Sequence, residues 1–180
     1  MKFWLLVPAI AALAIAGIAW GAGEARVSNK SLEAVESMVN DKFRGAGPDP
    51  YDVLAAAHCT YLEGYGAITT VEIQLIYLSG VNPFRPAYSP QEIANVRERK
   101  LKKLPILRDA MRSLLAASAT RLDSVPPEQR IALDASLQHF SWEDSRGIPQ
   151  RLLMSGEKSK ILAAQGSPAA LAAAIEEQVQ

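Results

Sequence analysis

The sequence predicts an α+β domain with two layers. About four strands, arranged as two hairpins in a mostly antiparallel sheet, are expected to pack against one long kinked helix, with additional helices at both ends. Two segments, 67–78 and 131–138, alternate apolar and polar residues with the period of a half-buried strand. Between them, residues 90–122 repeat apolar side chains at helical spacing. The economical solution places this helix across the apolar face of the sheet.

The first 25 residues have the pattern of an export signal. Lys2 precedes the uncharged run 3–22, and Gly23 and Ala25 fit a cleavage site of the small-x-small type. We therefore expect residues 1–25 to be a signal peptide. The alternative is an uncleaved anchor in the inner membrane, because the run 3–22 is just long enough to span a bilayer. Either way the protein is expected to be exported, with a periplasmic or secreted location if the leader is removed.

Composition gives little indication of a partner. The chain has 19 Lys and Arg against 19 Asp and Glu, so its charge balance does not favour nucleic acid. Its single cysteine, Cys59, cannot form an internal disulfide. The residues after the leader are enough for one domain with its own core. We expect no cofactor.

The first elements of the domain follow a linker at residues 26–30. Ser31 is a suitable cap for a helix that reaches the breaker segment 44–50. Strands are predicted at 53–61 and 67–78, and the glycines of the segment 63–66 would turn them into a hairpin.

The long helix has the clearest local start signal. Ser89, Pro90 and Glu92 form a capping box with proline at the first helical position, after a loop at 79–90. Pro105 lies inside the helix and is expected to kink it.

A second hairpin is predicted from strands 131–138 and 151–155, joined by the turn-like segment 143–149. A short helix at 157–165 would complete a single domain over residues 31–165. The alanine-rich segment 166–180 is expected to form a loosely packed helix that continues through Gln178.

Two groups of residues suggest chemistry. A catalytic nucleophile and base pair would have to be Cys59 and His139, because adjacent His58 and Cys59 point to opposite faces of a strand and cannot serve each other. A metal site would have to join His139 with Glu143, Asp144 and His58, but no spaced ligand motif supports it, so no metal is expected.

One short pattern resembles an enzyme motif. Ser155 and Lys158 match the S-x-x-K pattern of penicillin-recognising enzymes, but the accompanying motifs are missing and the chain is too short for that fold.

Three features suggest binding instead. Tyr65 would be displayed at the glycine turn, and the loop 79–90 carries Phe84, Arg85 and Tyr88, which are residue types that favour interfaces. Between Arg97 and Arg112 the long helix holds seven bases that scatter around its axis, which favours a solvated face over an anion-binding stripe. The candidate binding residues on this helix are Arg97, Lys100 and Lys103.

Four segments taken together resemble a group of uncharacterised exported bacterial proteins. They are 61–75 with its GYG, the basic helix 97–115, and the closing pair 131–142 and 149–162. The resemblance implies the same order of elements and an exported location. The group has no assigned activity, so no site residue is carried over from it.

These observations favour an exported domain that acts by interaction rather than catalysis, in the periplasm or associated with the envelope. Its partner would be a protein or another envelope component, bound through the more polar sheet face or the loop 79–90. Membrane contact is expected only through the N-terminal segment. Two alternatives stay open: a small exported hydrolase built on Cys59 and His139, and a basic-helix module that binds anionic lipid or polyanion.

Overall fold

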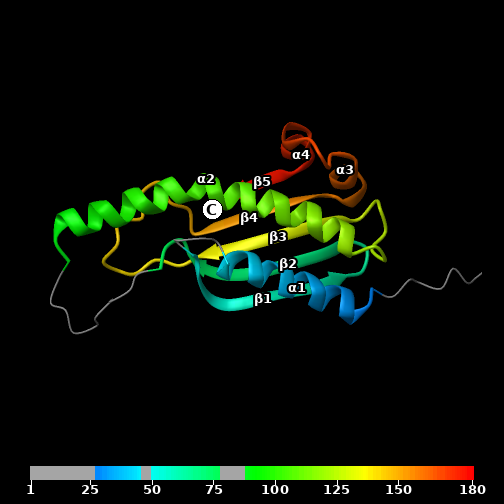
Figure 1. Cartoon of the computed structure of the whole chain (residues 1–180), viewed down its shortest axis with the longest axis horizontal. Helices are drawn as coiled ribbons and strands as arrows, with labels where there is room; N and C mark the ends of the chain where they lie inside the picture. Colours follow the sequence, from blue (N-terminus) through cyan, green and yellow to red (C-terminus); the bar gives the residue numbers. More distant parts are fainter. Residues whose placement is uncertain (1–26, 46–49, 78–87) are drawn as a thin grey trace, which may run out of the picture.

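A five-stranded sheet forms the centre of the protein (Figure 1). The computed structural model describes residues 27–45, 50–77 and 88–180. Its strands follow the spatial order β1-β2-β3-β4-β5, with bounds β1 (Asp52–Leu62), β2 (Gly66–Gln74), β3 (Arg130–Leu137), β4 (Arg151–Glu157) and β5 (Glu176–Val179). The α+β class is confirmed, but the sheet has five strands where about four were expected.

The sheet is mixed and mostly antiparallel. β1 pairs with β2 and β3 pairs with β4 in antiparallel fashion, so both predicted hairpin pairings are present. β2 and β3 are parallel to each other. This pairing requires a crossover, which α2 (Pro90–Arg121) provides by carrying the chain back along the sheet.

The C-terminal segment differs from the expectation. The predicted helix through Gln178 is the shorter α4 (Pro168–Ala174), and β5 follows it along the edge of β4. Glu177 of β5 bonds to Arg108 and Arg112 of α2, at sequence separations of 69 and 65 residues. Contacts at that range are invisible to local propensity, which the alanines bias toward helix.

The helix starts show how closely local signals fix the elements. α1 (Asn29–Arg44) begins one turn before the predicted start, because Ser28 accepts the N–H of Ser31 and so acts as the cap. At α2, Ser89 and Glu92 form the predicted capping box. This helix continues through Pro105 to Arg121 without a break. The short α3 is Lys158–Ala163.

The core lies between one face of the sheet and the two longer helices, which both cover that face (Figure 1). Alternate residues of the central strands point into it, as the period-2 pattern predicts. From the helix side the largest fully buried side chains include Phe43, Leu107, Met111 and Leu115. We call this face of the sheet the inner face and the opposite one the outer face.

The first hairpin turns at a glycine that no other residue could replace. Gly66 has a φ of 131°, and a β carbon there would lie 1.9 Å from the carbonyl oxygen of Arg130. The amide of Arg130 donates to the carbonyl of Tyr65. The glycine therefore allows β3 to approach the turn closely, which secures the parallel pairing of β2 and β3.

Helix α1 covers the free edge of β1. The backbone N–H of Ala57 donates to Oδ1 of Asn40 at 2.9 Å, and that of Cys59 donates to Oε1 of Glu36 at 2.8 Å. Asn40 and Glu36 are one turn apart on the helix, so their acceptors match two alternate donors of the strand. An edge strand that could otherwise pair with another chain is thereby hydrogen-bonded to a helix of its own chain.

Replacing Glu36 and Asn40 by alanine should release this edge. Each substitution leaves a part-buried N–H without its acceptor, which should cost about 1–3 kcal/mol of unfolding free energy in urea denaturation. Amide hydrogen exchange at Ala57 and Cys59 should accelerate, and the double variant should aggregate more readily in light scattering. Glu33→Ala on the exposed side of α1 is the matched control. Unchanged exchange at both amides in the double variant would show that α1 does not protect the edge.

Candidate functional site

Residues 138–150 between β3 and β4, called here loop 138–150, form the most elaborate polar site among the described residues. The loop docks on the N-terminal half of α2. Arg97 donates from Nε to the carbonyl of Arg146 at 2.9 Å and lies 3.7 Å from a carboxylate oxygen of Asp144. Ile148 of the loop is buried. The loop is thus fixed to the helix by both polar and apolar contacts.

Three aromatic rings stack where this loop meets the start of α2. The rings of Tyr88 and Trp142 lie 3.9 Å apart between centroids at an interplanar angle of 21°. Phe140 lies 5.8 Å from Trp142 and is nearly parallel to it. All three side chains keep part of their surface exposed. Because Tyr88 precedes α2 and the other two belong to the loop, the stack joins two distant segments of the chain.

Beneath the loop, a charged cluster is withdrawn from solvent. Lys100 of α2 bonds to Glu143 of the loop, and each of these side chains is 1% exposed. His139 completes the cluster, with its Nδ1 at 3.4 Å from the Lys100 ammonium and 3.5 Å from Oε2 of Glu143. A buried pair of this kind contributes most to specifying one arrangement, because either charge alone would be costly to bury.

His139 is held at both ring nitrogens. Its Nδ1 lies 3.4 Å from the Lys100 ammonium and 3.5 Å from Oε2 of Glu143, and its Nε2 lies 3.2 Å from the carbonyl oxygen of Pro149, which can only accept. Both ring nitrogens are therefore engaged. A general base needs a nitrogen free to take a proton from substrate, and this arrangement offers none.

The ionisation of Glu143 follows from two opposing effects. Burial acts to raise its pKa, but the bonds from His139 and Lys100 outweigh burial and hold the pKa below its usual value. The carboxylate is consequently charged, and its Oε1 is a buried acceptor with no partner among the described residues.

The bases of α2 are largely used inside the molecule. Of the seven bases from Arg97 to Arg112, five have partners outside the helix, so the expected solvated face is a minor feature. Besides Arg97 and Lys100, these are Lys103, which donates to the carbonyl of Pro50 and lies over the Tyr51 ring, and Arg108 and Arg112, which bind Glu177. Lys102 pairs only with Glu98 on the same exposed face. The structure therefore offers little support for an anion-binding stripe.

Cys59 and His139 are not brought together. Across the sheet, Cys59 pairs with Thr69 and Thr69 pairs with Leu133. His139 comes six residues after Leu133, which corresponds to roughly 20 Å of extended chain. Burial raises the pKa of the Cys59 thiol, and a hydrogen bond to Thr69 offsets this only in part. His58 points to the other side, as predicted, where its Nδ1 lies 2.9 Å from Glu36.

The residues that a metal site would have needed are also divided. His139 and Glu143 meet, but they do so around Lys100, and Asp144 pairs with Arg146, whose hydrogen bonds hold the Asp144 pKa well below its usual range. Within residues 27–45, 50–77 and 88–180 no three His, Cys, Asp or Glu side chains gather in a way that could hold a metal ion.

The S-x-x-K lysine has a structural explanation. Lys158 donates to three main-chain carbonyls, those of Leu122, Asp123 and Val125, at 2.6–2.9 Å. It thus satisfies carbonyls that follow the end of α2. Burial lowers the pKa of Lys158, and the nearby Asp123 opposes that shift.

The remaining candidates are scattered. Tyr65 occupies the turn between β1 and β2, far from the aromatic stack, while Phe84 and Arg85 lie outside the described residues. The outer sheet face is polar: Asp134 is bound in bidentate fashion by Arg151, and Arg130 bonds to Ser155 and Glu176.

Sequence reasoning missed how these residues combine. It singled out Tyr88, Arg97, Lys100 and His139 for three unrelated reasons, and the structure brings all four to loop 138–150. Trp142 and Phe140 received no role, although an aromatic pair beside a turn-rich segment was an available signal. Apart from their opposite charges, nothing in the sequence around Arg151 and Asp134 indicates that these two residues pair.

No family model, curated protein or solved structure matches this chain. Among the described residues, no helix has both the length and the apolar character needed to cross a bilayer.

Substituting one member of the buried pair should destabilise the domain strongly. Lys100→Met leaves the Glu143 carboxylate buried without its ammonium, which should cost about 3–5 kcal/mol in urea denaturation. The double variant Lys100→Met/Glu143→Leu should recover most of that loss. Lys102→Met, on the exposed face of the same helix, is the control and should leave stability unchanged. A double variant no more stable than the single one would contradict an ion-pair origin.

The same carboxylate should contribute to acid sensitivity. Because the pKa of folded Glu143 lies below its unfolded value, its contribution is present at neutral pH and is lost as pH falls below about 4, through the folded pKa. A Glu143→Gln variant should therefore show a flatter decline of unfolding free energy between pH 5 and 3 than the wild type. If unfolding free energy declined with pH equally in the two proteins, Glu143 would not contribute to the acid sensitivity.

Proposed function

We propose that this protein is an exported, non-enzymatic interaction domain of the cell envelope. It contacts its partner through the end of the molecule formed by loop 138–150 and the start of α2, which we call the aromatic end. The observation that carries the proposal is the partly exposed stack of Tyr88, Trp142 and Phe140. Tyrosine and tryptophan dominate the binding energy of protein surfaces when they are rigidly held.

The stack is held rigidly. Lys100 and Glu143 fix the loop one residue after Trp142, and Arg97 and Arg146 fix it further on. Side chains that are already ordered lose less conformational entropy on binding, so such a surface gains affinity from the same contacts. The polar cluster beneath the stack is thereby explained as support for a binding surface.

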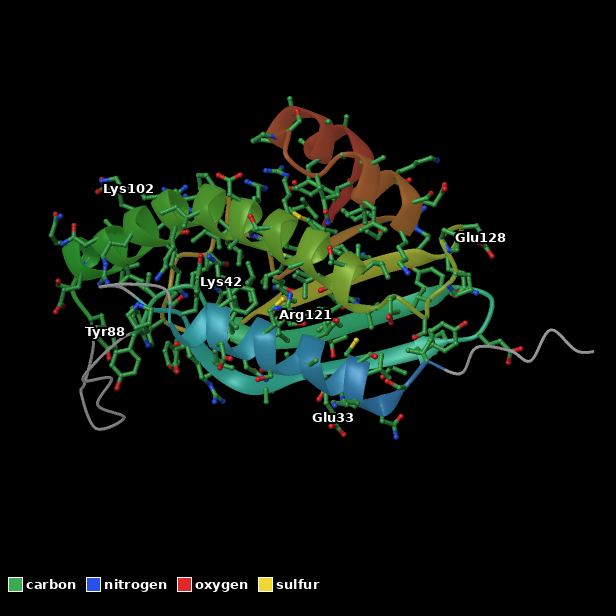
Figure 2. The ribbon with its side chains drawn as sticks, turned by 45° about the vertical axis from the view of Figure 1, so that its right-hand side comes forward. Glu33, Lys42, Tyr88, Lys102, Arg121 and Glu128 are labelled. Carbon is green, nitrogen blue, oxygen red and sulfur yellow. The ribbon has the colours of Figure 1, made fainter. Side chains whose placement is uncertain are left out.

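The position of the aromatic end suits an exported protein. Tyr88 lies at one end of the molecule and Glu128 at the other (Figure 2). α1 begins on the side of the molecule that holds Glu128 (Figure 2), and the 32 residues of α2 span about 48 Å between the two ends. A leader that precedes α1 would thus attach at the end opposite the aromatic stack. If residues 3–22 were retained as an anchor, the aromatic end would lie on the side of the domain away from the attachment point.

The two alternatives receive weaker support. A hydrolase would need Cys59 or His139, but the thiol is buried with a raised pKa and both imidazole nitrogens are bound. A module for anionic lipid or polyanion would need free cations on α2, and most of those are paired within the fold.

The interface is tested by photo-cross-linking in cells that produce the full chain. A benzophenone amino acid in place of the exposed Ser141 should give a defined adduct, and the same group in place of Glu128 should not. Tyr88→Ala should remove the adduct from position 141 while lowering stability only slightly, because the ring is partly exposed. Tyr65→Ala, at the other end, should leave the adduct unchanged.

Two outcomes would contradict the proposal. One is an adduct from position 128 but none from 141. The other is an adduct from 141 that survives Tyr88→Ala in a variant whose circular dichroism and unfolding midpoint match the wild type.

A further inference from the structure

A groove runs between α1 and α2 on the exposed side of the two helices. It consists of two hollows of about 670 and 540 Å³, which share Asp41, Lys42 and Ser113 in their walls. Lys42 and Arg121 mark this side of the molecule in Figure 2. Asp41 and Lys42 are neighbours of opposite charge, so together they add no net charge to the groove. Small and apolar side chains form much of the remaining wall, among them Ala34, Met38, Leu114, Ala117, Ile106 and Ala110.

The two ends of this groove have opposite shapes. At one end Ile106 of α2 projects into solvent with 61% of its surface exposed, and no large apolar side chain of the described residues is more exposed. At the other end the wall of α2 is lowered to Ala117 and the facing wall of α1 to Ala34. Ser113 borders both hollows and lies between these ends. The groove thus has a projection and a recess on either side of one small residue.

A twofold axis close to Ser113 would match each projection with a recess. Ile106 comes seven residues before Ser113, which is about 10 Å along the helix. A second α2, antiparallel to the first about this axis, would bring its own Ile106 to the level of Thr120, equally far beyond Ser113. The larger hollow extends over this level, from Ser113 to Arg121. Because the Ser113 side chain is small and exposed, two helices that cross there can approach closely.

The exposed charges of α2 agree with the same axis. Asp109 comes four residues before Ser113, so the axis would place it beside Ala117 of the second copy. The Asp109 side chain is 79% exposed and pairs at 3.0 Å with Arg112 of its own helix, which leaves most of the carboxylate open to a second cation. The exposed Arg121 follows Ala117 by one turn. Because helical side chains lean toward the N-terminus of their helix, the Arg121 guanidinium would meet Asp109 of the second copy.

We infer that two copies of this chain associate through α2, packed antiparallel about a twofold axis close to Ser113. In such a contact the Ile106 side chain of each copy enters the larger hollow of the other, and Asp109 of each pairs with Arg121 of the other. The projection, the recess, the acid and the base all lie on one helix at matching distances from Ser113. A second copy requires this self-complementarity, whereas a partner of another sequence would not. The aromatic end lies outside this face, so the inference goes beyond the proposed function and does not depend on it.

A disulfide cross-link across the axis tests the geometry in cells that produce the full chain. Ser113→Cys would bring two thiols together at the axis, so mild oxidation should give a covalent dimer of twice the chain mass on a non-reducing gel. Asn95→Cys is the matched control, because Asn95 is exposed on the same helix but lies about 27 Å from Ser113, and it should give no dimer. The native Cys59 is buried and should not contribute.

Charge reversal tests the ion pair. Sedimentation velocity of the purified protein should show a monomer–dimer equilibrium. Asp109→Arg or Arg121→Asp alone should weaken it by about tenfold or more, because each change places like charges together twice. An equimolar mixture of the two variants should recover the wild-type affinity, since both ion pairs then form again between the two kinds of chain. Both side chains are exposed, so the unfolding midpoint of the dilute monomer should match the wild type and serve as the fold control.

Removal of the projection tests the apolar contact. Ile106→Ala should weaken the dimer by about tenfold, because the large apolar side chain no longer enters the hollow. Leu54→Ala is the matched control, because Leu54 is 47% exposed but belongs to β1, and it should leave the dimer Kd unchanged.

Three results would overturn the inference: a monomer at every concentration up to about 1 mM, equal cross-linking from positions 95 and 113, or a mixture of the charge variants that associates no better than either alone. A covalent adduct of position 113 with a different protein, without the dimer, would assign the groove to that protein and would overturn it as well. The charge variants should leave the adduct from position 141 unchanged. Failure of the dimer would therefore be distinguishable from failure of the proposed function.

Discussion

The packing of α2 across the inner face of the sheet is the contact on which the rest of the structure depends. This one helix buries the main apolar ridge of the core, supplies the crossover that makes β2 and β3 parallel, and holds both loop 138–150 and the edge strand β5. Its Lys100 holds loop 138–150 through Glu143, and its Arg108 and Arg112 hold β5 through Glu177. The basic side chains of α2 thus bind two segments that follow it in the sequence, loop 138–150 and β5.

The two edges of the sheet are treated differently. α1 occupies the edge of β1 with the acceptors of Asn40 and Glu36, while β5 ends the other side as a strand of four exposed residues that begins with two glutamates. Shortness and charge are recognised ways to discourage pairing with other chains. The fold therefore limits edge-to-edge association at both edges of the sheet.

Local sequence signals predicted most of the elements. The capping box at Ser89, the alternation in β2 and β3 and the glycine turn at Gly66 each act within a few residues, and each has its expected form. The parallel pair, β5 and the site could not be predicted in that way. They depend on contacts such as Glu177 with Arg108 and Lys100 with Glu143, which join residues that are 69 and 43 positions apart.

If residues 1–25 are the leader that the sequence predicts, the early start of α1 has a consequence for the order of processing and folding. Cleavage after Ala25 would leave only Arg26 and Val27 before the cap at Ser28. A peptidase binds its substrate as an extended chain, and residues close to a packed helix cannot easily adopt that form. Because Val35, Val39 and Phe43 of α1 are fully buried, the helix cannot leave the sheet once the core has formed. Removal of the leader would therefore have to precede docking of α1, which makes processing and folding competing steps in time.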